Sequence, residues 1–80
     1  MASEMDFELR GEHIALDALL KATGLATSGG EAKARIVGGG VSVNGQVELR
    51  RARKVRAGDM VACGALRVRV RGAPGADAPR

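Results

Sequence analysis

The sequence is poor in aromatic, cysteine and histidine side chains. Its 80 residues include no tryptophan or tyrosine, one phenylalanine (Phe7), one cysteine (Cys63) and one histidine (His13). One cysteine cannot form an internal disulfide, so packing alone must hold the fold, as is usual in the reducing cytoplasm. The lone histidine has no cysteine or carboxylate partners at metal-ligand spacing. We therefore expect no disulfide, no metal ion and no other cofactor.

The shortage of aromatic rings also limits how the chain could bind nucleic acid. Proteins that recognise single strands by stacking need exposed rings. Phe7 alternates with acidic residues, which places it on the inner face of a strand. The remaining mode is recognition of the backbone and shape of a folded or duplex nucleic acid.

Catalytic and membrane-spanning patterns are missing as well. The glycines at positions 38–40 precede an expected strand rather than a helix, so they do not form a phosphate-cradling loop, and no paired carboxylates suggest a catalytic site. No apolar run approaches a membrane span, and the acid-rich first ten residues lack the apolar core of a signal peptide. We expect a non-catalytic cytoplasmic protein without a membrane or small-molecule partner.

Charge is unevenly distributed along the chain. In total, 13 lysines and arginines oppose 9 aspartates and glutamates, for a net charge of +4. Residues 1–31 carry a net charge of −4, whereas residues 32–80 carry +8. Residues 50–56 contain five basic side chains and no acidic one. Repulsion within such a run favours an anionic partner, although solvated charge runs are also common, and nucleic acid is the leading candidate.

The apolar pattern of the first half predicts a strand followed by two helices. Apolar residues alternate with charged ones over residues 5–9, as on a half-buried strand. A helix that starts near Ile14 places three leucines on one face and ends before Gly24, which suits the left-handed position after a helix. Ser28 and Glu31 have the spacing of a capping box, so a second helix opens there.

The second half has a period of two and predicts two hairpins. In the first, pairing Val43 with Val47 and Val41 with Leu49 keeps all four side chains inside, so we expect a three-residue loop with a bulge. In the second, a two-residue turn at positions 64–65 keeps its apolar residues on one face.

The last expected strand presents a basic row, Arg67, Arg69 and Arg71, opposite its apolar face. Asp6 and Glu8 on the first strand form an acidic row of the same period, so parallel or antiparallel pairing of the two strands would neutralise both rows. The sequence leaves open whether these arginines pair in this way, the interpretation we favour, or contact nucleic acid.

Together these elements predict one α+β domain over residues 1–71, with an N-terminal strand, two short helices and a small sheet rich in hairpins. Residues 72–80 contain no apolar residue larger than alanine, so we expect a disordered tail.

The order and spacing of several short motifs are similar to a known family. The motifs are Ser28-Gly29-Gly30-Glu31-Ala32-Lys33, Ile36, Gly40-Val41-x-Val43-Asn44-Gly45, Glu48, Arg50 and Val55-x-x-Gly58-Asp59-x-Val61. This pattern resembles the RNA-binding domain named after small-subunit ribosomal protein S-four, and within that superfamily the short stand-alone proteins of the YbcJ and YaaA type. The resemblance implies a small α+β fold in which two helices and the next hairpin form one basic surface against structured RNA.

The resemblance also implies which residues lie on that surface. They are Lys33 and Arg35 on the second helix, Asn44 and Gly45, which shape the hairpin, and Arg50, Arg51, Arg53 and Lys54 beyond it. Lys33 could instead lie over the edge of the core, and Arg35 could form a surface ion pair with Glu31, four residues before it.

We therefore expect a non-catalytic, monomeric RNA-binding protein. Ribosomal RNA or ribosome-associated transfer RNA is the target class that the resemblance implies. The alternative is a protein-interaction adaptor that docks on a ribosomal protein or an RNA-processing enzyme.

Overall fold

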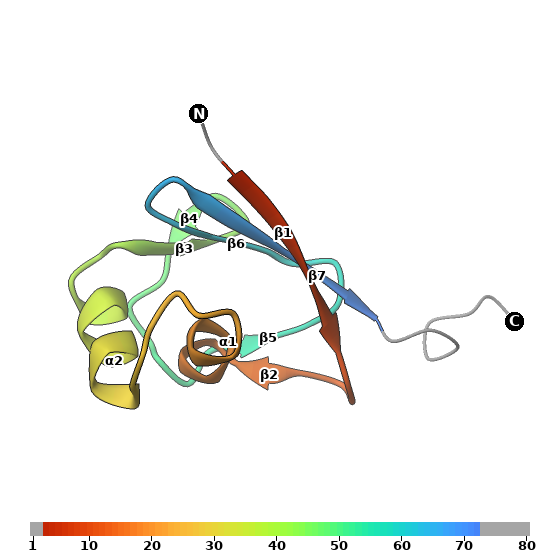
Figure 1. Cartoon of the computed structure of the whole chain (residues 1–80), viewed down its shortest axis with the longest axis horizontal. Helices are drawn as coiled ribbons and strands as arrows, with labels where there is room; N and C mark the ends of the chain where they lie inside the picture. The colour runs from red at the N-terminus through yellow and green to blue at the C-terminus, as the bar shows by residue number, and fades with distance from the viewer. Residues whose placement is uncertain (1–2, 73–80) are drawn as a thin grey trace, which may run out of the picture.

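A computed structural model describes residues 3–72, which form the α+β fold expected from the sequence (Figure 1). Its elements in chain order are β1 (Ser3–Leu9), β2 (Ile14–Ala15), α1 (Leu16–Ala22), α2 (Gly29–Val37), β3 (Val41–Val43), β4 (Gln46–Val47), β5 (Lys54–Val55), β6 (Met60–Cys63) and β7 (Leu66–Gly72). Gly72 ends β7, and the remainder of the expected tail, residues 73–80, lies outside the described residues.

One face of a five-stranded sheet packs against the two helices, which Figure 1 shows on the same side of it. The strand order is β1-β7-β6-β3-β4, and β1 is parallel to β7 while the other neighbours are antiparallel. The core includes the three leucines expected on α1 and also Cys63, all of them buried. Within residues 3–72 no helix is long and apolar enough to cross a membrane.

The expected pairing of the first and last strands is confirmed, and it is parallel. Ion pairs join the two strands on the open face of the sheet: Arg69 lies 4.0 Å from Glu4, and Arg71 lies 3.5 Å from Asp6. The acidic partners are thus Glu4 and Asp6 rather than Asp6 and Glu8. The structure therefore accounts for two arginines of the basic row as partners of β1.

The prediction for the first hairpin is wrong. Val43 pairs with Gln46 across a two-residue turn, Asn44-Gly45, without the expected bulge. Both turn residues have positive φ, +53° at Asn44 and +87° at Gly45. Asn-Gly favours such a turn, because its twist matches that of the flanking strands. Turn geometry therefore decides the register against the apolar pattern.

This register reverses the side chains that follow the turn. Val47 and Leu49, expected inside, are 63% and 56% exposed, whereas Glu48 between them is only 8% exposed. The Glu48 amide donates to the Val41 carbonyl oxygen at 3.0 Å, which continues the pairing beyond β4. The second hairpin has the predicted two-residue turn and register.

The first helix begins two residues later than predicted. Ile14 and Ala15 form β2, which pairs with β5. The first amides of α1 then find backbone partners on the segment before β5: Leu16 donates to the Arg53 carbonyl at 2.9 Å, and Asp17 donates to that of Arg51 at 3.1 Å. Long-range pairing thus replaces the first helical turn and joins residues 51–55 to β2 and to the start of α1.

The second helix has the predicted cap at Ser28, with one difference. The Ser28 hydroxyl accepts a hydrogen bond from the Glu31 amide at 3.1 Å, as in a capping box. The Glu31 carboxylate, however, accepts from the amide of Thr27 at 2.9 Å rather than from that of Ser28. The side chains still satisfy amides at the start of α2, so its basic residues sit on a helix with a fixed beginning.

Replacing Leu9 with alanine tests the contribution of β1 to the core. Leu9 is buried at the end of β1, so Leu9→Ala should lower the free energy of unfolding by about 2–5 kcal/mol through lost burial and a residual cavity. Urea denaturation followed by circular dichroism measures the change. The neighbouring exposed residue gives a control, Glu8→Ala, with an expected change within about 0.5 kcal/mol. Equal stability of Leu9→Ala and the parent would contradict a core role for β1.

Candidate nucleic-acid interface

The predicted site residues fall on three segments of the fold. Lys33 and Arg35 are exposed on α2, and Asn44 and Gly45 form the turn between β3 and β4. The other four lie on residues 48–54, the segment from the end of β4 to the first residue of β5, which we call the basic loop. The backbone contact of Glu48 with Val41 places the start of this loop beside the strand that follows α2.

The carboxylate of Glu48 holds two arginines of the basic loop. Its Oε2 atom accepts from the backbone amide and the Nε atom of Arg50, both at 3.1 Å. Its Oε1 atom accepts from Nη1 of Arg53 at 2.7 Å and from Nη2 of Arg50 at 3.4 Å. These bonds, the one from the Arg50 side chain first, lower the pKa of Glu48 from 4.5 to about 2. Glu48 is therefore a carboxylate at neutral pH.

Glu48 changes the electrostatic interpretation of the basic run. The sequence within residues 50–56 contains no acid, and its self-repulsion pointed to an external anion. In the fold, Glu48 supplies part of that negative charge from within the chain. Sequence reasoning missed this role, and the available signal was an acid two residues before the run. The basic run therefore needs an external anion less than its sequence indicates, because Glu48 already reduces the repulsion among its cations.

The two arginines nevertheless remain accessible. The side chain of Arg50 is 76% exposed and that of Arg53 is 34% exposed, although both bond Glu48. A guanidinium group has five N–H donors in a fixed fork, so donors that do not face Glu48 can bind a second acceptor. Glu48 therefore fixes two guanidinium groups at the surface without covering them.

The remaining cations of the basic loop are held through the backbone. Arg51 and Lys54 are exposed, and neither forms an ion pair among residues 3–72. The contacts with α1 fix the main chain at Arg51 and Arg53, and the pairing of β5 with β2 fixes it at Lys54. A shallow hollow in this surface is lined by Arg50, Ala52, Arg53 and Lys54. Three cationic side chains thus surround one depression that could receive a phosphate.

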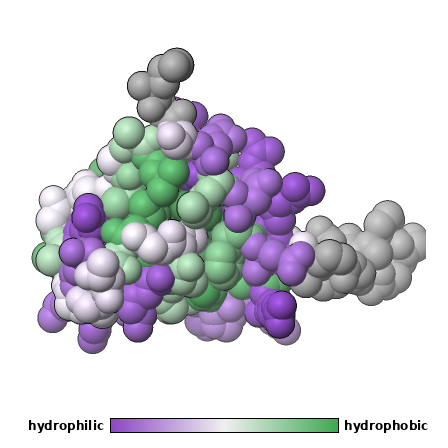
Figure 2. Space-filling view, in the orientation of Figure 1, coloured by the Kyte–Doolittle hydropathy of each residue, from purple (hydrophilic) through white to green (hydrophobic). Residues whose placement is uncertain are grey.

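The cations of α2 differ from each other in their surroundings. Lys33 is exposed and forms no ion pair within the described residues. Arg35 lies 4.0 Å from Glu31, which is the alternative ion pair considered from the sequence. Both partners are well exposed, and such pairs contribute little to stability. On the face that Figure 2 shows, hydrophilic residues gather over α2 and along β1, with an apolar area between them.

Asn44 shapes the hairpin through bonds within the protein. Its side-chain Nδ2 donates to Oδ1 of Asp59 at 3.0 Å, and its Oδ1 accepts from the amide of Met60 at 2.9 Å. Its backbone amide donates to the Met60 carbonyl at 2.7 Å. Because both ends of the amide group are occupied, Asn44 fixes the turn against the start of β6.

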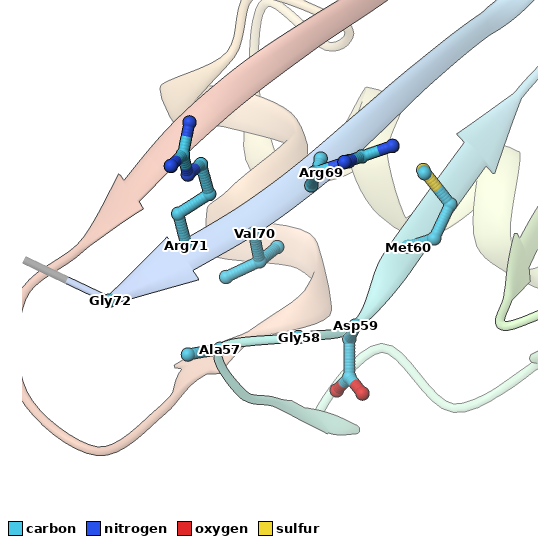
Figure 3. Close-up of a pocket in the computed structure, with 8 residues that line it drawn as sticks. All are labelled: Ala57, Gly58, Asp59, Met60, Arg69, Val70, Arg71 and Gly72. Atoms are coloured by element: carbon cyan, nitrogen blue, oxygen red, sulfur yellow. The ribbon is translucent and has the colours of Figure 1, made fainter. Parts of the chain in front are cut away.

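Another hollow lies at the end of β7, lined by Ala57, Gly58, Asp59, Met60, Arg69, Val70, Arg71 and Gly72 (Figure 3). In this view the Arg71 side chain extends upward from β7 and that of Arg69 extends to the right, while Asp59 points down, away from β7. Both arginines already pair with acids of β1. We do not assign this hollow to the interface. Across residues 3–72, no three potential metal ligands gather in one place.

The low pKa of Glu48 predicts a pH-dependent contribution to stability. A depressed carboxyl pKa stabilises the fold above the unfolded value near 4.5, and this contribution is lost as the pH falls toward 2. The parent should melt at a higher temperature than Glu48→Gln near neutral pH, and the difference should shrink between about pH 5 and pH 2. Calorimetry across this range measures it, with Glu8→Gln, an exposed strand residue, as control. A difference that does not vary with pH would contradict the ion-pair role.

Comparison with known protein families agrees with this architecture. The S4 domain family matches residues 7–71, which include the end of β1, both helices and the other strands except the last residue of β7. A search of curated proteins gave no match. S4 domains are in general non-catalytic modules that bind RNA. Because the match covers most of the 80 residues, the chain belongs to the S4 domain family.

Proposed function

We propose that the protein binds folded RNA through α2 and the basic loop and recognises the phosphate backbone and its shape. The observation that carries the proposal is the Glu48 carboxylate, which fixes Arg50 and Arg53 while their side chains stay accessible. Arg51 and Lys54 add exposed charge on the same loop. A fixed group of cations can bind phosphate with little further loss of side-chain freedom.

Folded RNA is favoured over single strands because stacking platforms are scarce. Phe7 is the chain's one aromatic residue, and it is half-buried against the core on the inner face of β1. Stacking on exposed rings is the usual basis of single-strand binding, whereas phosphate contacts and shape suffice for helical RNA. The target class we propose is ribosomal RNA or ribosome-associated transfer RNA. This choice rests on the likeness to a ribosomal protein's domain. We also propose a monomeric, cytoplasmic form without a cofactor.

A second candidate function is a protein-interaction adaptor, and the exposed apolar residues of the first hairpin favour it. Val47 lies just before the basic loop and Leu49 lies within it, on either side of Glu48 in the sequence, and both side chains are exposed. An adaptor would use this surface to dock on a ribosomal protein or an RNA-processing enzyme. Nuclease treatment of a complex purified from cells separates the two functions. Release by RNA digestion favours RNA binding, and a complex that survives digestion favours the adaptor.

Removing the two freely exposed cations of the basic loop tests the proposed surface. The variant Arg51→Gln/Lys54→Gln leaves the Glu48 ion pairs in place, so the fold should be retained. Its affinity for a folded RNA should fall. The negative slope of log affinity against log salt should become shallower by about 0.7–0.9 for each lost phosphate contact. Fluorescence anisotropy with a ribosomal RNA hairpin and an unstructured strand of equal length measures both effects. The hairpin should bind more tightly.

The matched control is Arg69→Gln/Arg71→Gln, which removes the same charge from arginines that pair with β1. This control should keep the parent's salt slope. If the two double variants bind equally well, net charge rather than the basic loop determines binding, and the proposed surface is wrong.

A further inference from the structure

The ion pairs between β1 and β7 are shifted by one step relative to the backbone register. In the register, acidic residues lie directly opposite arginines, as the pairs Glu4 with Arg67, Asp6 with Arg69, and Glu8 with Arg71. The side chains instead pair diagonally, so that Glu4 reaches Arg69 and Asp6 reaches Arg71. The shift leaves one cation without a partner at one end of the row, Arg67, and one acid at the other, Glu8.

Arg67 therefore differs from the other two arginines of its strand. Among residues 3–72 it forms no ion pair, and it is exposed on the open face of the sheet. An exposed guanidinium group without an acidic partner keeps its full charge and all five donors for an external anion. Arg69 and Arg71 each share their charge with a carboxylate.

Arg67 also lies beside the turn that belongs to the proposed interface. A hollow on the open face is lined by Ser42, Asn44, Gly45, Met60, Ala62 and Arg67. The lining contains one cation and no acid. Asp59, which bonds the Asn44 side chain, does not line the hollow and also accepts from the amide of Arg56. The hollow thus offers a guanidinium group and a serine hydroxyl among residues that carry no charge.

We propose that Arg67 binds a backbone phosphate of the same RNA in this hollow. The RNA-binding surface then extends from the basic loop past the Asn44-Gly45 turn onto the open face of the sheet. Arg69 and Arg71 stay outside it, because the carboxylates of Glu4 and Asp6 beside them are exposed and would repel a phosphate. Arginine suits this role because its planar fork matches phosphate oxygens. The inference rests on the proposed function, since it extends the same interface to a further residue.

Three single variants on one strand test this inference: Arg67→Gln, Arg69→Gln and Arg71→Gln. Each removes one positive charge from the open face, so long-range attraction to RNA changes equally in all three. Arg67→Gln should weaken binding to the folded RNA and lower the salt slope by about 0.7–0.9, the contribution of one phosphate contact. The other two should keep the parent's slope. Unchanged thermal melting of Arg67→Gln would show that lost binding is not lost folding.

The outcomes separate this inference from the proposed function. If the parent binds folded RNA and Arg51→Gln/Lys54→Gln weakens it, but Arg67→Gln behaves like Arg69→Gln, the Arg67 site is wrong and the basic loop stands. If the parent does not bind folded RNA, both proposals fail. Loss of the slope contribution in Arg67→Gln alone among the three variants supports the extended surface.

Discussion

The basic loop depends on the Glu48 carboxylate, whose Oε2 atom accepts a hydrogen bond from Arg50 and whose Oε1 atom accepts one from Arg53. A buried carboxylate is costly unless it is paired and hydrogen-bonded, and closely spaced cations repel one another. Here the two arginines stabilise the buried carboxylate, and the carboxylate reduces the repulsion between the arginines. The same contact places Arg50 at the surface with most of its side chain exposed. One acid therefore serves both the folding of the loop and the presentation of its positive charge.

Backbone hydrogen bonds fix the end of the basic loop, as Glu48 fixes its start. The basic loop contributes to the fold through the two-residue pairing of β2 with β5, and its carbonyl groups accept the first amides of α1. An irregular segment is thus fixed at its start by a side chain and at its end by the main chain. A surface ordered before binding loses less conformational entropy when it meets RNA. The exposed cations Arg51 and Lys54 benefit because their backbone lies between these fixed points.

The sequence predicted a hairpin correctly where the turn residues and the alternation of apolar residues imply the same strand register. At the β6–β7 turn, Gly64 and the flanking alternation lead to one register. At the β3–β4 turn they conflict, and the positive-φ turn leaves Val47 in water and buries Glu48. The start of α1 at Leu16 could not be predicted, because a two-residue strand has no period and its partner is distant in sequence. The charge pattern predicted the cations of the basic loop. The role of Glu48 was not predicted, because the expected hairpin register placed Val47 and Leu49 inside and Glu48 outside.

From the arrangement of charge we infer that α2 and the basic loop contact RNA while the paired charges of β1 do not. Amide chemical shifts of isotope-labelled protein, recorded while a folded ribosomal RNA hairpin is added, test this claim residue by residue. We expect the largest changes on the basic loop, on α2 and at the turn formed by Asn44 and Gly45, with little change along β1. Changes concentrated on β1, or an absence of change on the basic loop at saturating RNA, would contradict it.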